Sequence, residues 1–418
     1  MIYFLVCNRA FVHNSKPTLL QQFNSFELYS DTHINSVSQL RRELKARGED
    51  DMLKELRKSA SGAGDVRMTS VRVFEAIIPG GNRVYVKEFL SVGATLGKVE
   101  MVTTKRLTRK FNENIEARVA AQEEITVFPT PPFPTLLGYL KTDKRIEDPI
   151  FKERWMERFP RISPPREGNL WLIFRWDEST FKSLKSFPKL PQIVEINEYM
   201  NKKTRDKKRW KFVRKTMLET LKAVRYFHRN GYCHNSIFAE SIWMSTTNQA
   251  EVDTLKVKLV DLGTAQAFSD LGKLSRQAAM EDLYNVGLVF IQFVINSFVD
   301  DTTGAMKARA KISGRNEMLE VMMNPDSTAR TQLGVEEISN VFEDICDSDF
   351  ATFRDFINSI QEWSLPSEML EANSGAGWKL IFRLLARGRL TDPQTGGRVK
   401  VTPSTLIKES KVLFEDVM

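Results

Sequence analysis

The sequence predicts an α+β protein in which a small antiparallel sheet precedes a larger helical part. Apolar residues alternate with polar ones, or run together in short blocks, in four stretches that are typical of strands: 71–78, 84–87, 132–139 and 170–176. The turn residues Pro79 to Asn82 join the first two stretches as a hairpin. Further on, apolar residues between 212 and 224 recur at helical spacing.

Composition fits a soluble globular protein. The chain has 418 residues, 42% hydrophobic and 27% charged, enough for a full core in one large or two ordinary domains. Cys7, Cys233 and Cys346 are too scattered for a zinc site or a disulfide framework. The cysteine pattern therefore favours a reducing compartment.

The positive charge is concentrated in one stretch. Residues 202–215 hold nine Lys or Arg and one acid, Asp206, and this excess equals the net charge of +8. A solvated helix face is the simpler interpretation. The alternative is contact with an acidic partner or a membrane surface, whereas nucleic acid is disfavoured because no aromatic repeat accompanies the charges.

The N-terminal region carries no clear fold signal. Residues 1–7 are apolar but too short and uncharged for a secretory signal, and we expect no apolar run of membrane-spanning length in the chain. Residues 8–32 weakly resemble an organelle transit segment, such as that of a chloroplast protein, and a disordered terminus in a cytoplasmic protein fits equally well. Residues 36–59 predict a helix, which a Gly/Ser break ends at Gly64.

The most informative stretch runs from Arg225 to Gly263. An apolar helix leads into a tight loop around His234, a short strand follows, and a second strand ends in Asp261-Leu262-Gly263. This order resembles the catalytic loop and metal-binding turn of protein kinases. The resemblance extends over residues 65–415 and implies a two-lobed kinase-like fold, with an N-lobe at 65–176 and a C-lobe at 177–418.

The catalytic loop departs from the family pattern at three positions. The resemblance places Ser236 at the catalytic base, Phe238 at the lysine that neutralises the transferring phosphate, and Ser241 at the asparagine that holds a second metal. A neutral serine cannot act as a carboxylate base near neutral pH. Ser241 is ambiguous, because a serine hydroxyl can ligate magnesium in other phosphate sites, and it stays a candidate metal ligand.

The resemblance also implies a nucleotide site. Lys87 matches the lysine on the third strand of kinases that binds the nucleotide phosphates, and Asp261 matches the aspartate that binds the metal. Within a helix expected at 105–128, Glu123 is the candidate partner of Lys87, and Glu116 and Glu124 are its rivals.

Other parts of the implied nucleotide site are weaker. Phe174 falls at the gatekeeper, with Arg175 and Trp176 in the adenine hinge. The glycine-rich loop of the family is poorly matched, because its three glycine positions fall near Val66, Met68 and Val71. Side chains at these positions hinder the approach of backbone amides to phosphate oxygens.

The segment that docks peptide substrates in the family is short. Only residues 264–281 separate Gly263 from Asp282, which opens a helix resembling one in the kinase C-lobe, and no Ala-Pro-Glu triplet lies between them. Arg398, the candidate for the arginine that pairs with that glutamate, would lack its partner. Residues 300–373 form an acidic insertion.

These features together favour a regulatory or scaffolding pseudokinase with a protein partner. Lys87, Glu123 and Asp261 leave room for ATP and one Mg²⁺. The first alternative is an active atypical kinase in which Ser241 is a metal ligand. The second is a pure binding module that uses the basic stretch at 202–215.

Overall fold

The computed structural model describes eleven segments of the chain. They are residues 18–26, 71–77, 83–89, 94–121, 130–142, 148–160, 164–175, 182–187, 202–298, 334–387 and 401–417. They divide into two compact units, the first comprising residues 1–177 with 261–265 and the second comprising 178–260 with 266–418.

The first unit contains a five-stranded antiparallel sheet in the order β1-β2-β3-β5-β4. Its strands are β1 (Thr18–Phe26), β2 (Val71–Ile77), β3 (Arg83–Phe89), β4 (Leu136–Lys141) and β5 (Leu170–Arg175). The predicted strands at 71–78, 84–87 and 170–176 are thereby confirmed, and the predicted α+β class with them. The hairpin turn Pro79 to Asn82 lies outside the described residues.

Strand β1 lies within residues 1–35, for which the sequence suggested a disordered or targeting segment. Thr18–Phe26 pairs antiparallel with β2, with two irregularities in register. The strand preceding β2 therefore comes from far upstream. The β1–β2 connection, with Val66, Met68 and the helix expected at 36–59, lies outside the described residues.

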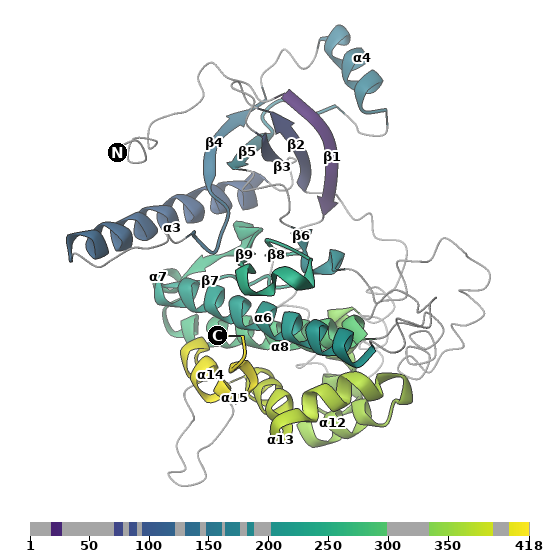
Figure 1. Ribbon diagram of the computed structural model, residues 1–418. Helices are drawn as coiled ribbons and strands as arrows, with labels where there is room; N and C mark the ends of the chain where they lie inside the picture. The colour runs from purple at the N-terminus through teal and green to yellow at the C-terminus, as the bar shows by residue number, and fades with distance from the viewer. Residues whose placement is uncertain are drawn as a thin grey trace, which may run out of the picture. The chain divides into compact units, whose positions relative to one another are not determined.

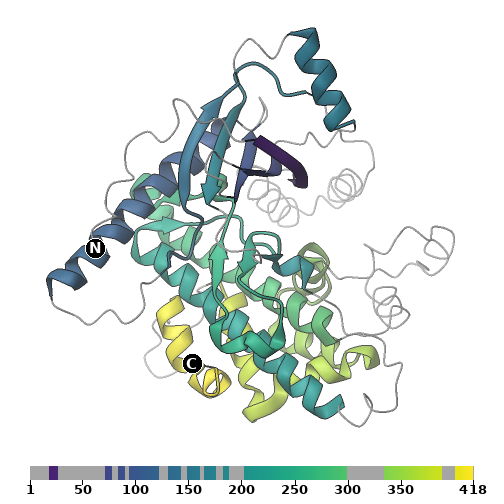
Figure 2. The ribbon, with the colours of Figure 1, turned by 45° about the horizontal axis from the view of Figure 1, so that its top comes forward.

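A helix packs against each face of this sheet. On one face, α3 (Ala94–Ala120) approaches β3 and β5 so closely that a Cβ on Gly97 would lie 2.7 Å from a ring carbon of Phe89. Both ribbon views show α3 extending beyond the sheet (Figures 1 and 2). On the other face, α4 (Pro149–Arg158), which lies in the connection between β4 and β5, buries Trp155 against Phe74 and Trp171.

The second unit is built around two long helices, α6 (Lys202–Arg229) and α8 (Ser275–Phe298). Its other helices are α7 (Phe268–Leu271), α11 (Val335–Asn340), α12 (Phe350–Asn358), α13 (Ser364–Leu385), α14 (Pro403–Glu409) and α15 (Lys411–Phe414). Short strands form two small sheets, β6-β8-β9 (Lys182–Ser183, Ile242–Met244 and Val257–Leu259) and β10-β7 (Gln266–Ala267 and Tyr232–Cys233).

Helix α8 is the core of this unit. The run Phe268–Phe298 is long and apolar enough to span a membrane, contrary to the expectation that the chain has no such run, but 67% of its most apolar window is buried. The core helix of a globular domain has the same length and hydropathy, so the run is weak evidence for a membrane span.

The acidic insertion is largely folded where it is described. Its later part supplies α11, a π-helical turn at Val341–Ile345 and α12, and it continues into α13. An arginine after α13, Arg387, forms ion pairs of 3.0 Å with Glu281 and with Glu343 of the π-helical turn. The arginine predicted to lack a partner, Arg398, lies outside the described residues.

Candidate functional site

A buried ion-pair cluster lies in the first unit, between β3, α3 and the segment Asp261–Ala265. Lys87 Nζ lies 2.5 Å from Asp261 Oδ1 and 2.7 Å from Glu100 Oε1. The side chains of Lys87 and Glu100 are 1% exposed and that of Asp261 is 11% exposed. The structure thus brings together two residues that the sequence placed in one site, Lys87 and Asp261.

The carboxylate of α3 that meets Lys87 is Glu100, which the sequence analysis did not consider. The helix was expected to begin at Lys105 but begins at Ala94, so Glu100 lies near its start. Gly97, one turn earlier, permits the close approach to β3 that brings Glu100 to Lys87. Of the predicted partners, Glu116 is exposed, whereas Glu123 and Glu124 lie outside the described residues.

The cluster contains two carboxylates and one ammonium. Burial alone would lower the pKa of Lys87, but the charges of Asp261 and Glu100 outweigh it and hold that pKa above its ordinary value. Burial raises the pKa of Glu100, an effect that Lys87 opposes and Asp261 strengthens. A backbone hydrogen bond from Leu262 also lowers the pKa of Glu100. With all three groups ionised, two carboxylates face one ammonium and the cluster carries a net negative charge.

Asp261 is held in an unusual backbone conformation. Its φ of 68° and ψ of 51° lie in the left-handed region, which a residue with a side chain seldom adopts. The next residues, Leu262–Thr264, form a buried 3-10 turn that packs against α3. Such strain persists where surrounding contacts enforce it, and it is common at functional sites.

The predicted gatekeeper, Phe174, is a core residue of the sheet. It is fully buried and stacks on Tyr85 of the neighbouring strand with ring centroids 5.0 Å apart. Its ring centroid also lies 5.6 Å from Lys87 Nζ, so it forms an apolar wall beside the ammonium. Arg175 ends β5 with its side chain exposed, and Trp176 lies outside the described residues.

In the second unit, the loop around His234 is held by the buried carboxylate of Asp282. The backbone N–H groups of His234 and Asn235 donate to it at 2.8 and 2.7 Å, and the His228 ring lies 2.9 Å from it. The ring of His234 contacts the carbonyl of Val260 at 2.8 Å. One buried carboxylate of α8 therefore holds the loop backbone at two successive residues.

The positions that carry the chemistry in kinases hold neutral side chains. Ser236 is buried, and its backbone N–H points to His234 Nδ1 at 3.3 Å. Phe238 is half-buried. Apart from His234, the one ionisable residue between 234 and 241 is Glu240, which is exposed and paired with Lys185 at 2.8 Å.

Ser241, the candidate second metal ligand, uses its hydroxyl within the loop. The Phe238 N–H donates to Ser241 Oγ at 2.9 Å, and Ser241 Oγ donates to the Phe238 carbonyl at 3.0 Å. One lone pair is left for a metal. Within the described parts of the chain, no group of three or more His, Cys, Asp or Glu is placed to hold a metal ion. Asp261 remains a candidate ligand, provided that Lys87 releases it.

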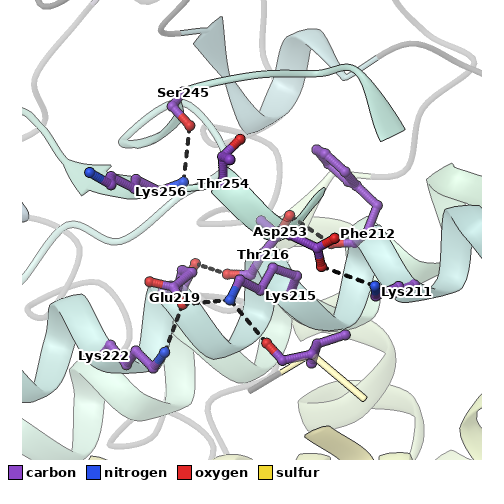
Figure 3. Close-up of polar contacts among 12 residues, drawn as sticks. Lys211, Phe212, Lys215, Thr216, Glu219, Lys222, Ser245, Asp253, Thr254 and Lys256 are labelled. Carbon is purple, nitrogen blue, oxygen red and sulfur yellow. Dashed lines mark hydrogen bonds and ion pairs between the residues drawn. The ribbon is translucent and has the colours of Figure 1, made fainter. Parts of the chain in front are cut away.

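The basic stretch 202–215 is only in part the solvated helix face that its sequence suggested, with Lys207 and Lys208 exposed. Arg209, Arg214 and Lys215 of α6 are buried rather than solvated. Both terminal nitrogens of Arg214 donate to the carboxylate of Asp416, at 2.5 and 2.8 Å. Lys215 Nζ donates to the Val417 carbonyl at 2.9 Å. Figure 3 shows Lys215 and, one turn earlier, Lys211, which pairs with Asp253 at 3.0 Å. Much of this charge is therefore used within the unit.

Comparison with known proteins adds little to this description. No family model and no curated protein matches the chain. A Stt7 homolog from Micromonas algae, in a crystal soaked with ATP, is 14% identical with a TM-score of 0.47, over 82% of this chain and 89% of that chain.

A second similar structure is the Neurospora crassa complex of PAN2 (WD40-CS1) with PAN3 (pseudokinase and C-term). The identity is 10% and the TM-score 0.40, over 85% of this chain and 61% of that chain. With identities of 10% and 14% and TM-scores below 0.5, neither similarity says anything about function. The fold is therefore described by its own elements, a five-stranded antiparallel sheet with helices in one unit and a mainly helical second unit.

Proposed function

We propose that this chain, whose fold is protein-kinase-like, is a catalytically impaired pseudokinase with a regulatory or scaffolding role. One observation carries the proposal. The loop framework held by Asp282 is complete, whereas Ser236, Phe238 and Ser241 stand where kinases place the base, the lysine and the asparagine. Phosphoryl transfer depends on charge stabilisation by such groups, so their joint loss removes most of the machinery.

The short segment after Gly263 supports the same proposal. It folds directly through β10, α7 and a 3-10 turn at Gly272–Leu274 into α8. These elements contain no extended stretch that could hold a peptide substrate. A protein of this kind acts through contact with a protein partner rather than through turnover.

Nucleotide binding is the second part of the proposal. Lys87 would contact a phosphate, and Asp261 would hold Mg²⁺. Because both are already engaged with each other, ATP and Mg²⁺ must compete with a buried ion pair. We therefore propose weak ATP binding that depends on the release of Asp261 from Lys87.

Thermal-shift titrations with ATP, with and without Mg²⁺, test nucleotide binding. Lys87→Ala should weaken ATP binding both with and without Mg²⁺. Asp261→Asn should weaken ATP binding chiefly when Mg²⁺ is present. Each response is measured relative to the variant's own melting temperature, because breaking a buried ion pair costs about 3–5 kcal/mol by itself. Lys98→Ala, on an exposed part of α3, is the matched control. Equal losses for Asp261→Asn in both conditions would contradict a metal-binding role.

A radiolabel transfer assay tests the catalytic part. We expect no transfer above background by the purified protein, since general-base assistance alone contributes about 10²–10⁴-fold. Ser236→Asp alone should not restore transfer, because Phe238 and Ser241 are unchanged. Stoichiometric labelling of a substrate that Asp261→Ala abolishes would instead establish the alternative, an active atypical kinase.

A further inference from the structure

The solvent side of helix α3 is positively charged. Four exposed residues at helical spacing form a single stripe along it: Lys98, Val102, Lys105 and Arg109. Between Ala94 and Asn112 the helix holds one acid, Glu100, whose side chain is buried against Lys87. The stripe therefore carries three cations, and no carboxylate from this part of α3 balances them.

Strand β4 continues the stripe. Tyr139, on β4, is 48% exposed, and Lys105 Nζ lies 4.9 Å from its ring centroid. Lys141 is also exposed, and it lies two residues after Tyr139, so both side chains leave the strand on the same face of the sheet. We call the α3 stripe, Tyr139 and Lys141 the α3–β4 surface.

The α3–β4 surface keeps its charge within the described part of the chain. Arg109 is its one cation with an ion-pair partner there, Glu113, which lies 3.4 Å from Arg109 Nε. The side chains of Arg109 and Glu113 are 72% and 59% exposed, so water screens their attraction and the pair is weak. Arg109 can therefore exchange this contact for a carboxylate from another molecule.

The outer side of β4 is an edge of the described sheet. The strand order ends at β4, which pairs, among the described strands, with β5 alone. After an irregularity in register between Leu136 and Gly138, this pairing continues to Lys141. An edge strand presents backbone N–H and C=O groups to which an extended chain can add as a further strand. A chain added to β4 would pass beside Tyr139 and Lys105.

We propose that the α3–β4 surface binds an extended acidic segment of a protein partner, which adds to the sheet as a strand beside β4. Every second side chain of such a strand faces the α3 side of the sheet, where carboxylates would meet Lys98, Lys105 and Arg109. At about 1.5 Å per helical residue the stripe is about 16 Å long, a length that about five extended residues span.

The chemistry of the alternate side chains follows from the opposite face of the sheet. Leu140 of β4 lies on that face, where it packs against the apolar cluster that contains Trp155 of α4. Side chains that the added strand directs to this face would extend the cluster if they were apolar. The expected segment therefore alternates acidic and apolar residues.

Three features favour a protein segment over other anions. Backbone pairing with β4 needs N–H and C=O groups at the spacing of a strand, which a lipid headgroup or a sugar-phosphate backbone does not offer. Tyr139 is the one aromatic ring of the surface, whereas single-stranded nucleic acid stacks on several. Val102 is the one aliphatic residue of the stripe, and a helix that lies on a membrane needs a broad apolar face.

This inference rests on the proposed function only in naming the chemistry of the protein partner. Its test uses the full chain without ATP, so its failure is distinguishable from that of the pseudokinase proposal, which the transfer assay decides. The probe is a fluorescent peptide of about eight residues in which Glu alternates with Val, followed by anisotropy at low and high salt. One comparison peptide has Lys in place of Glu, and another has Pro in place of Val, which removes backbone N–H groups.

The protein variants separate the effect of charge from an effect on folding. Lys105→Glu combined with Arg109→Glu reverses two charges of the stripe. Arg154→Glu is the matched control, because it reverses an exposed charge on α4, which covers the other face of the sheet. All three side chains are exposed, so both variants should melt like the parent.

We expect the Glu–Val peptide to bind the parent and Arg154→Glu equally, and to bind both less tightly at high salt. The double charge reversal should weaken binding about tenfold or more, because attraction becomes repulsion at two positions. The Lys and Pro peptides should also bind about tenfold more weakly or worse. Amide hydrogen exchange within residues 136–141 should become slower in the complex, because the added strand pairs with the outer N–H groups of β4.

Three results would overturn the proposal. The first is no peptide binding by the parent, or binding that the double charge reversal does not weaken. The second is binding that leaves the exchange of residues 136–141 unchanged, which would exclude strand addition. The third is tighter binding of a uridine oligonucleotide, or of vesicles containing phosphatidylserine, than of the peptide, which would assign the surface to a nucleic acid or to a membrane.

Discussion

Replacing Asp282 is the most direct test of the loop framework in the second unit. Its carboxylate is fully buried and accepts hydrogen bonds from the backbone N–H groups of His234 and Asn235. Asp282→Ala leaves both groups without an acceptor, at about 1–3 kcal/mol each. Removing a buried charge returns part of this cost. We therefore expect a loss of about 2–4 kcal/mol in the free energy of unfolding.

The assay combines urea denaturation with hydrogen exchange. In Asp282→Ala, the amides of His234 and Asn235 should lose protection before those of the core of α13, because the defect is local. Asp253→Ala, which removes an exposed carboxylate, should stay within about 0.5 kcal/mol of the parent. An Asp282→Ala variant with the stability and exchange pattern of the parent would refute the framework role.

Two further changes test other parts of the structure. Gly97→Ala should cost about 1–3 kcal/mol by urea denaturation, because its Cβ would overlap Phe89, whereas Asn112→Ala on the exposed end of α3 should be near neutral; equal stabilities would contradict the close packing. Partial burial would raise the pKa of Asp416, but Arg214 outweighs it and holds that pKa below its ordinary value. The stability that this pair contributes is therefore present above about pH 4 and is lost as the pH falls through the lowered pKa. Amide hydrogen exchange of residues 413–417 in the parent should therefore become faster in acid, relative to the intrinsic exchange rate. Asp416→Asn should show that faster exchange already at pH 7. Identical exchange-versus-pH profiles for the two proteins would argue against the pairing.

The parts of the fold that the sequence predicted are those with a local signal. Strands β2, β3 and β5 alternate or run apolar because they are buried. Asp282 was found because the apolar part of α8 follows it, although the helix itself begins earlier, at Ser275. Strand β1 was missed because it is polar, lies at the edge of the sheet and pairs with a strand far along the chain.

The site was harder to predict, because its contacts depend on helix position. Gly93 and Gly97 lower the helical signal around Glu100, so a later start of α3 was expected and later glutamates were considered. In the basic stretch, long side chains bury their stems while their charged ends find carboxylates and carbonyls. A count of charges could not distinguish that arrangement from a solvated face.

The membership of residues 261–265 in the first unit has a practical consequence for dissecting this protein. A fragment that ends at Asp177 would contain the whole sheet but would lack Asp261, and Lys87 would face Glu100 alone. The first unit is therefore discontinuous in sequence, and a cut at the apparent boundary divides its charged centre between two pieces. A faithful minimal version would graft the five-residue turn back onto the sheet, for instance through a flexible linker after residue 177.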